Sequence, residues 1–251
     1  QLMLFQDLCT GCGLCVETCP EKAIAIANGK AVIDRIKCVN CGQCEAICLS
    51  KARVISGKRM TVNEVMNVVC KDELFYFNSG GGVTFCGGEP TMAGNFLLAL
   101  QHACRSHGYH VCLDTCGQCP TEKFREFVKL SDLVLFDIKH MDPEMHKDVT
   151  GVDNRLILEN LREIVRLGVP YRIRIPLIPG LNDTEENIKR LAVLLKEFCK
   201  DEVDVLPCHA FGKNKYAALS KPEPTYPGYS PEALKNVLKY FDAHNLHTII
   251  V

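Results

Sequence analysis

From residue 58 onward, short apolar runs alternate with longer segments in which apolar residues recur every three or four positions. The runs end at glycine, proline or polar residues and predict buried strands at residues 82–86, 109–114, 132–137, 171–178, 203–206 and 247–251. The periodic segments predict helices from a Thr61–Glu64 capping box to Val69, from Phe96 to near Gly108, from Thr121 past Val128, from Leu156 to Gly168, from Asp183 past Leu195, and from Ser230-Pro231 to Tyr240.

This alternation predicts an α/β fold with a parallel sheet and helices outside it, either open or curled into a barrel. Five strand–helix units are visible, and the first predicted helix has no strand before it. In such folds the chemistry lies at the carboxyl ends of the strands. Those ends carry Gly87-Gly88-Glu89-Pro90, Asp114-Thr115, Asp137 with Lys139, Arg174 and His209. We therefore expect these side chains to lie close together at one end of the sheet.

The first part of the chain contains two cysteine runs of the form C-x-x-C-x-x-C-x-x-x-C. They comprise Cys9, Cys12, Cys15 and Cys19, followed by Cys38, Cys41, Cys44 and Cys48. Three thiolates spaced in this way can surround one iron–sulfur cube, while the fourth ligates the neighbouring cube. The spacing predicts two [4Fe-4S] clusters, one held by Cys9, Cys12, Cys15 and Cys48 and the other by Cys38, Cys41, Cys44 and Cys19. The alternatives are a disulfide framework, which needs an oxidising compartment, and paired zinc sites, which seldom have this spacing.

Residues 1–57 form the predicted cluster-binding domain, and residues 58–251 form the second domain. Within the first, apolar residues 23–26 and 31–33 predict a hairpin that turns at Asn28-Gly29, and each cysteine run is expected to end in a short helix. The predicted end of this domain is marked by Ser56-Gly57-Lys58.

Composition narrows the class of protein further. With 251 residues and 47% hydrophobic content, the chain can bury a full core, and a net charge of -1 gives no pull toward nucleic acid or a membrane surface. Sixteen cysteines and no secretory signal or spanning segment favour a reducing cytoplasm. Because the chain begins at Gln1 and the first cysteine run follows at once, we expect further residues upstream.

The motif Gly87-Gly88-Glu89-Pro90 directly follows a predicted strand. Paired glycines let the backbone approach a ligand, a carboxylate accepts hydrogen bonds from an ammonium, and proline stiffens the exit. A tight turn with a solvated Glu89 is the alternative that the motif alone leaves open.

In context, the motif resembles the one with which radical S-adenosylmethionine (SAM) enzymes hold the amino group of SAM. The string from Ser79 to Pro90 resembles the activating enzymes of glycyl radical enzymes, as do Asp114-Thr115-Cys116-Gly117, Asp137-Ile138-Lys139-His140 and Leu206-Pro207-Cys208-His209. The cysteine block is similar to an insert found in many members, although pyruvate formate-lyase activase lacks it. The resemblance implies a partial (β/α)6 radical SAM barrel without its first strand, plus a small α+β ferredoxin-like domain of bacterial type.

The resemblance also implies roles for individual residues. Gly87, Gly88 and Glu89 would bind the amino end of SAM, Asp137, Ile138 and Lys139 its sugar and carboxylate region, Arg174 its carboxylate, and His209 its adenine or ribose. Asp114, Thr115 and Asp137 match a monovalent-cation site beside the sulfonium. The alternatives are a carboxylate satisfied by backbone donors for Asp137, surface ion pairs for Arg174 and Lys139, and a core-capping histidine for His209.

One departure concerns the catalytic cluster, which the family holds on a C-x-x-x-C-x-x-C loop upstream of the two-cluster insert. Cys112, Cys116 and Cys119 have this spacing, but Cys112 and Asp114 alternate on a predicted strand, so we reject them as a cluster site. Cys116 occupies the variable position of an Asp-Thr-x-Gly turn. For the remaining cysteines the expectation is a buried free thiol, namely Cys70, Cys86, Cys104, Cys112 and Cys199.

The leading hypothesis is therefore an activase that cleaves SAM reductively and places a radical on a glycine of a large partner enzyme in an oxygen-free cytoplasm. A flavodoxin or ferredoxin-like protein would donate electrons through the two clusters to a third [4Fe-4S] cluster on an upstream segment, and this fragment alone would be inactive. The alternatives are an electron carrier without SAM chemistry and a radical SAM enzyme with another substrate. Partner choice is expected in surface loops that include residues 211–227.

Overall fold

The computed structural model describes the chain except for residues 199, 210–211 and 223–227. The chain forms two compact units, which are presented separately. The first contains Gln1–Arg59 and His209–Thr225, and the second contains Met60–Cys208 and Tyr226–Val251. None of the described helices combines the length and apolar character required to cross a lipid bilayer.

The elements of the first unit are β1 (Leu2–Leu4), the 3-10 helix η1 (Gln6–Leu8), α1 (Leu14–Thr18), β2 (Ile24–Ala27), β3 (Lys30–Ile33), α2 (Gln43–Ala46), β4 (Arg53–Ile55) and α10 (Lys213–Ala218). Those of the second unit are α3 (Val62–Val69), η2 (Cys70–Asp72), α4 (Glu73–Ser79), β5 (Gly82–Phe85), η3 (Pro90–Ala93), α5 (Asn95–Ser106), β6 (His110–Thr115), α6 (Thr121–Lys129), β7 (Leu133–Asp137), α7 (Pro143–Thr150), α8 (Arg155–Leu167), β8 (Tyr171–Leu177), α9 (Glu185–Glu197), β9 (Glu202–Pro207), α11 (Pro231–Ala243) and β10 (His247–Ile250).

Two antiparallel strand pairs build the first unit. The predicted hairpin of β2 and β3 is present, and Asn28 and Gly29 supply the positive φ angles that its turn requires. The sequence did not predict the second pair, in which β1 lies against β4 with Leu2 opposite Ile55. Leu2, Leu4, Ile24 and Ala31 pack around four buried cysteines, so the small core of this unit consists largely of the cysteine runs themselves.

Helix α10, which follows β9 by only a few residues in the sequence, packs in the first unit. Arg35 donates hydrogen bonds to the carbonyl oxygens of Leu2 and Ala218, so one guanidinium ties β1 to the end of α10. The expectation of a surface loop at residues 211–227 is therefore wrong for the described helical part, whereas residues 211 and 223–227 lie outside the described residues.

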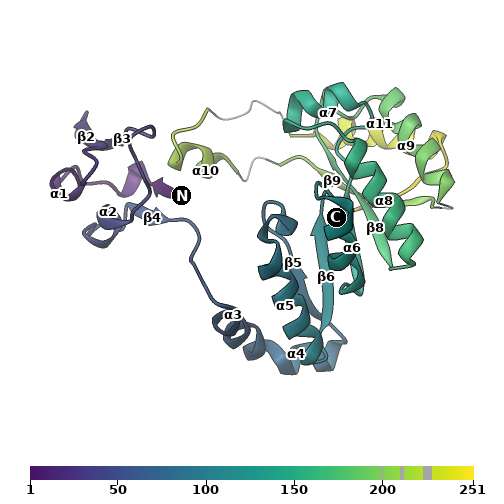
Figure 1. The fold of residues 1–251 in the computed structure, drawn as a ribbon. Helices are drawn as coiled ribbons and strands as arrows, with labels where there is room; N and C mark the ends of the chain where they lie inside the picture. The colour runs from purple at the N-terminus through teal and green to yellow at the C-terminus, as the bar shows by residue number, and fades with distance from the viewer. Residues whose placement is uncertain (199, 210–211, 223–227) are drawn as a thin grey trace. The chain divides into compact units, whose positions relative to one another are not determined.

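The second unit is built on a six-stranded sheet in the order β10-β9-β8-β7-β6-β5 (Figure 1). Every neighbouring pair is parallel, so the predicted parallel α/β architecture is confirmed. Each predicted strand is present within two residues of its expected limits. Among the described residues, β5 and β10 lie at the two edges of the sheet and do not pair with each other.

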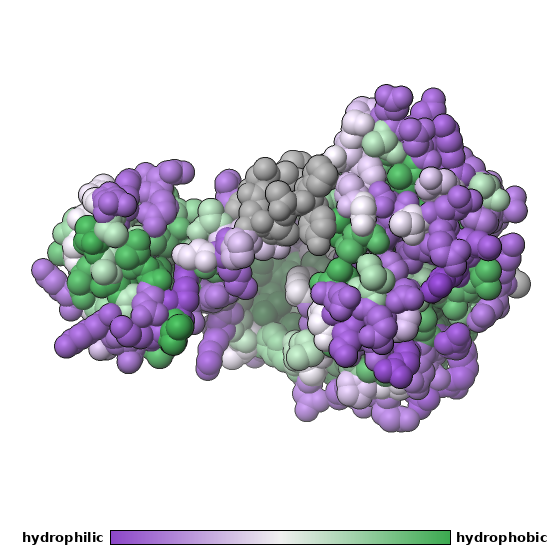
Figure 2. Space-filling model, turned by 90° about the horizontal axis from the view of Figure 1, so that it is seen from above, coloured by the Kyte–Doolittle hydropathy of each residue, from purple (hydrophilic) through white to green (hydrophobic). Residues whose placement is uncertain are grey.

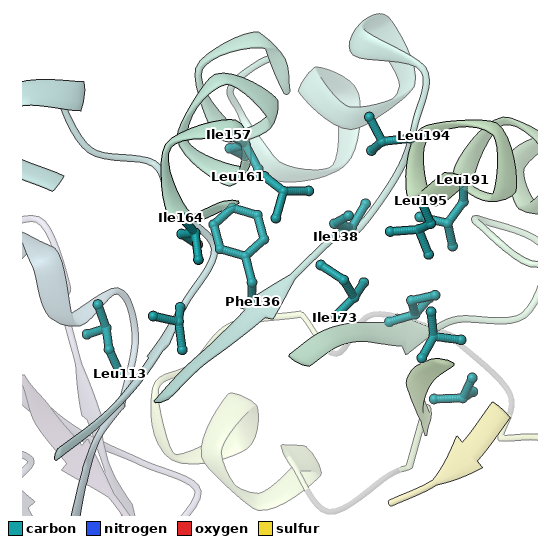
Figure 3. Close-up of a cluster of buried hydrophobic side chains, with 14 of the residues drawn as sticks. Leu113, Phe136, Ile138, Ile157, Leu161, Ile164, Ile173, Leu191, Leu194 and Leu195 are labelled. Carbon is teal, nitrogen blue, oxygen red and sulfur yellow. The ribbon is translucent and has the colours of Figure 1, made fainter. Parts of the chain in front are cut away.

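Successive helices of the second unit lie beside one another, with α5 next to α6, α6 next to α8, and α9 next to α11. The surface of the second unit that Figure 2 shows is largely hydrophilic. The inner sides of these helices carry the core, in which side chains of β7 and β8 face those of α8 and α9 (Figure 3). Phe136 lies at the centre and meets Phe124 edge to face, with 6.4 Å between the ring centroids. Burying each large apolar side chain of this kind stabilises the fold by about 1.5–3 kcal/mol.

Two of the predicted helix starts are confirmed by their caps. Thr61 and Glu64 form a reciprocal capping box at α3, and the Ser230 hydroxyl accepts from the Ala233 N–H at α11. Helix α7 was not predicted, although Asp142 caps it by accepting from the N–H groups of Glu144 and Met145. Its sequence lacks the apolar stripe on which our helix assignments relied, since mainly His146 is buried.

The turn after β6 depends on a glycine. Gly117 has a φ of +73°, and a Cβ atom there would lie 2.6 Å from the buried Phe136 ring. Gly180 has the same φ of +73°, but a Cβ there would meet nothing within 4 Å. Substitutions at Gly117 and at Gly180 therefore distinguish the cost of backbone strain from the cost of a steric clash.

We expect Gly117→Ala to lower the free energy of unfolding by about 2–5 kcal/mol, because about 1–2 kcal/mol of left-handed strain adds to overpacking of the core. Gly180→Ala should lower it by the strain alone. Urea unfolding of both variants measures the difference. Equal losses would show that the Phe136 ring moves aside without cost.

Candidate functional site

The parallel register brings charged residues together at the carboxyl end of the sheet. Asp137 at the end of β7 lies directly opposite Arg174 of β8. Arg174 Nη1 lies 2.6 Å from Asp114 Oδ2 of β6, and Arg174 Nε lies 4.0 Å from Asp137 Oδ1. Lys139 Nζ lies 3.2 Å from the other oxygen of Asp137, Oδ2. Four of the predicted residues therefore form one connected charge cluster across three strands.

The alternatives for these residues can now be judged. Asp137 Oδ1 is buried without a hydrogen-bond partner, so the reading of Asp137 as a carboxylate satisfied by backbone donors is wrong. The Arg174 side chain is only 17% exposed, which distinguishes its pair with Asp114 from a solvated surface pair. Lys139 is 36% exposed, so its pair with Asp137 is the most solvated contact of the cluster.

Burial raises the pKa of Asp137, and the repulsion from Asp114 adds to this effect, whereas Lys139 and Arg174 oppose it. The positive charges nearby therefore do not fully compensate the carboxylate. An unpartnered carboxylate oxygen in such surroundings suits a cationic ligand. This donor chemistry fits either a monovalent cation or the positively charged parts of SAM.

Glu89 is held in place by five donors. Its Oε1 accepts from the Thr91 N–H at 3.2 Å and from the hydroxyls of Thr91 and Thr115 at 2.7 and 2.6 Å. Its Oε2 accepts from the N–H and the thiol of Cys116 at 2.9 and 3.1 Å. Burial alone would raise the pKa of Glu89, but the bonds from Thr115, Cys116 and Thr91 outweigh it and lower the pKa.

Glu89 is thus an ordered carboxylate that joins the loop after β5 to the turn after β6, and the solvated-turn alternative is not what the structure has. Its acceptor positions are taken, but the hydroxyl and thiol donors can rotate. A cationic ammonium donor makes a stronger hydrogen bond than they do and can replace them. Before Glu89, Gly87 and Gly88 adopt φ angles of +93° and +62° with open space around their Cα atoms, so the backbone there is accessible.

Three predicted residues occupy other surroundings. The Thr115 hydroxyl is already shared between Glu89 and the Gly117 N–H. Ile138 points into the core (Figure 3) and its N–H donates to the Arg174 carbonyl, so its contact with SAM stays a prediction. His209 belongs to the first unit, whereas the others lie in the second, so its contact with the same ligand stays a prediction.

The eight cysteines of the two runs are all free thiols, and the described cysteines form no disulfide. A small cavity is lined by Cys19, Cys38, Cys41 and Cys44 together with apolar residues that include Leu2 and Ile24. This set combines the last cysteine of the first run with three of the second. Cys9, Cys15 and Cys48 lie buried in the same small core.

The surroundings of these sulfurs suit anionic ligation. The N–H groups of Ala31 and Ala23 donate to the sulfurs of Cys9 and Cys19 at 3.4 and 3.3 Å. Burial alone would raise the pKa of Cys9, but N–H groups of Ala31 and Gly11 and the charge of Arg53 help to lower it. N–H groups directed at sulfur are a known feature of iron–sulfur sites.

In the described part of the chain, no three histidine, cysteine or acidic side chains converge as ligands of a single metal ion.

The cysteines within and directly after β6 do not form a third set. Cys112 lies within β6, Cys119 is buried, and Cys116 donates to Glu89. Burial and the neighbouring Glu89 raise the pKa of Cys116 to about 11, so it is a neutral thiol. The structure therefore supports the rejection of Cys112, Cys116 and Cys119 as cluster ligands.

The expectation of buried free thiols is confirmed for Cys104 and Cys112 and wrong for Cys86, which is exposed at the end of β5. Cys70 is half-buried, and Cys199 lies outside the described residues. Cys86 directly precedes Gly87, and this open loop leaves its side chain in solvent.

Sequence reasoning missed two contributors. Thr91 donates twice to Glu89, a contact that its position directly after Pro90 could have suggested. Arg53 is only 3% exposed and reaches the sulfur of Cys48, although it follows the cysteine run as an ordinary residue of a short strand. No local pattern distinguishes it from a surface arginine.

Comparison with known proteins places the chain in a family. Residues 35–192 match the radical SAM superfamily, and residues 8–52 match the 4Fe-4S dicluster domain. The chain is 38% identical to a trans-4-hydroxy-L-proline dehydratase activating enzyme of Clostridioides difficile over 100% of this chain and 84% of that protein. It is 39% identical to a (2S)-3-sulfopropanediol sulfolyase activating enzyme of Bilophila wadsworthia over 84% of this chain and 70% of that protein.

A solved structure supports the same assignment. A domain of a pyruvate-formate lyase-activating enzyme from Bacteroides vulgatus superposes with a TM-score of 0.56 at 32% identity, covering 68% of this chain and 99% of that one. The two family matches, the relatives and the parallel sheet agree with one another. The chain belongs to the radical SAM superfamily and, within it, to the activating enzymes of glycyl radical enzymes.

Proposed function

We propose that this radical SAM enzyme binds SAM at the carboxyl end of its sheet and generates a radical on a backbone glycine of a large partner enzyme. The observation that carries the proposal is the charge cluster of Asp114, Arg174, Asp137 and Lys139, which shares the β6 end of the sheet with the ordered Glu89.

When bound, reduced clusters and SAM supply the electron and the carbon radical that such a reaction needs. The chain's own residues bind SAM and orient it. Glu89 offers a fixed carboxylate to the ammonium, and Asp137 offers an unpartnered oxygen to a second positive centre. Lys139 and Arg174 balance the remaining negative charge and are placed to meet a carboxylate. Asp114 and Asp137 would hold a monovalent cation, with Thr115 contributing through the turn that it stabilises.

The eight cysteines would hold two [4Fe-4S] clusters, in the crossed arrangement in which each run lends its last cysteine to the other cluster. Exposed apolar residues lie next to three of them in the sequence, namely Leu8, Val39 and Leu49. They offer a contact surface to an electron donor such as a flavodoxin or a ferredoxin. Exposed clusters and a glycyl radical require an oxygen-free cytoplasm.

The identity of the partner enzyme does not follow from the relatives. The two relatives named above are 38% and 39% identical, yet one is named for a hydroxyproline dehydratase and the other for a sulfopropanediol sulfolyase. The alternative of an electron carrier without SAM chemistry loses support, because the radical SAM match covers strands β5 to β8 and includes Glu89 and Asp137. A radical SAM enzyme with a different substrate is the remaining alternative. A glycine-centred electron paramagnetic resonance doublet on mixing with a glycyl radical enzyme would distinguish the two.

The cluster assignment predicts iron contents. The 251-residue chain, reconstituted without oxygen, should bind about eight irons, and Cys44→Ala should reduce this to about four because one cluster loses a ligand. Cys104→Ala removes a buried thiol outside the runs and should leave the iron content unchanged. Iron analysis with visible absorbance measures both variants. About twelve irons in the unmodified chain would contradict the assignment.

The site assignment predicts SAM affinities. Glu89→Gln should weaken SAM binding by about 10- to 100-fold, because a hydrogen bond to a charged group contributes about 1.5–3 kcal/mol. Glu126→Gln, which alters an exposed glutamate paired with Lys123, should bind as the unmodified protein does. Isothermal titration calorimetry measures both. Unchanged affinity in Glu89→Gln, with an unchanged unfolding midpoint, would refute the proposed site.

The raised pKa of Asp137 predicts a pH dependence. Since the folded state holds the proton more tightly than the unfolded state, ionisation of Asp137 lowers the free energy of unfolding. This cost is absent below the unfolded pKa of about 3.9, grows as the pH rises to the folded pKa, and is complete above it. The free energy of unfolding of Asp137→Asn, relative to that of the unmodified protein, should therefore increase as the pH rises from 4 to neutral. The increase should follow the ionisation of Asp137 in the unmodified protein.

Asp132→Asn is the matched control, for which we expect the opposite dependence of stability on pH. Burial alone would raise the pKa of Asp132, but the Val111 N–H and Arg105 outweigh it and lower the pKa. Its carboxylate therefore stabilises the fold above its unfolded pKa, and this contribution is lost as the pH falls through the folded pKa. Urea unfolding over a pH series should show opposite trends for the two variants, and parallel trends would contradict the assignment.

A further inference from the structure

Arg53 is a buried charge without a counter-charge. It lies in β4 opposite Leu4 of β1, and its side chain is 3% exposed. Its Nη1 points at Cys48 Sγ at 3.9 Å, whereas Nε and Nη2 are buried without a hydrogen-bond partner. Within the described residues, Arg53 forms no ion pair with any carboxylate.

A guanidinium in this position needs an anion, because a buried charge is tolerated when it is paired and its donors are used. The groups close to Arg53 are thiols. Cys48 belongs to the same buried core as Cys9, Cys15 and Cys44, so this core holds sulfurs of both runs. The two unused donors are buried and lack the acceptor that a bound anion would supply.

We propose that Arg53 sets the reduction potential of the iron–sulfur clusters, chiefly of the cluster that Cys48 ligates, by placing a positive charge and N–H donors beside the cluster sulfurs. The inference rests on the proposed ligation by the eight cysteines. A [4Fe-4S] cluster with four thiolates is an anion and gains one further negative charge when it accepts an electron. Arg53 therefore stabilises the reduced form more than the oxidised form and raises the potential. Low exposure strengthens this effect, because little water screens the charge.

The alternative is that Arg53 only fills space under β1 and β4. Two variants separate charge from volume. Arg53→Lys keeps a positive charge, and Arg53→Met replaces the side chain by a neutral one of similar length. Arg59→Met is the matched control, because Arg59 is an exposed arginine of the same unit whose charge lies in water.

The experiment uses the reconstituted chain, with the iron content measured first and the midpoint potentials then determined by titration monitored with electron paramagnetic resonance. At the potential at which the unmodified cluster is half reduced, Arg53→Met should lower its ratio of reduced to oxidised form at least tenfold, which for one electron is a shift of about 59 mV to lower potential. Arg53→Lys and Arg59→Met should change this ratio by less than about threefold, since both leave the buried charge in place.

Each outcome decides between charge and packing. An Arg53→Met protein with full iron content and unchanged potentials overturns the proposal, and so do equal shifts in Arg53→Met and Arg53→Lys. Loss of iron in both variants also overturns it, since this indicates a packing role. Loss of iron in Arg53→Met alone supports it, because the anionic cluster then needs the charge in order to assemble. An unmodified chain without about eight irons would instead refute the ligation on which the inference rests.

Discussion

The parallel register of neighbouring strands is the constraint on which the candidate site depends. In a parallel sheet all strands end at the same edge, so residues that are far apart in sequence become neighbours there. Asp114, Asp137 and Arg174 come from three consecutive strands, and their side chains meet within ion-pair distance. A shift of one residue in any of these strands would turn its charge to the opposite face of the sheet. The packing of Phe136 and its neighbours, which holds the register, therefore also positions the charges.

Each unit contains a charged side chain with buried polar atoms that have no hydrogen-bond partner. In the second unit this is Asp137, whose Oδ1 has none although Arg174 lies within ion-pair distance, and in the first it is Arg53, whose Nε and Nη2 have none. The signs are opposite, and each is the complement of the group that we propose to bind there. SAM carries a sulfonium and an ammonium, whereas a cluster with four thiolates is an anion. Such unpaired groups cost stability in the free chain, and that cost is offset when the ligand binds.

Predictions that depend on residues close together in the sequence agree with the structure, whereas features that depend on residues far apart in the chain were missed. Strands, helix caps and the Asn28-Gly29 turn depend on neighbours in the sequence, and these predictions are confirmed. The pairing of β1 with β4 and the packing of α10 in the first unit involve partners far apart in the chain, and neither was predicted. The exposure of Cys86 was misjudged because its loop, and not its residue type, decides its surroundings.

By itself the sequence determined the residue types available for chemistry and their order, since cysteine spacing, glycine turns and strand periodicity are local properties. These sufficed for the parallel fold and for the family. Tertiary structure alone decided which donors surround Glu89, that Asp137 keeps a free oxygen, and that Arg53 is buried beside the cysteines. The physical reason is that burial and pairing of a charge depend on every group that packs around it, and most of those groups come from distant parts of the chain.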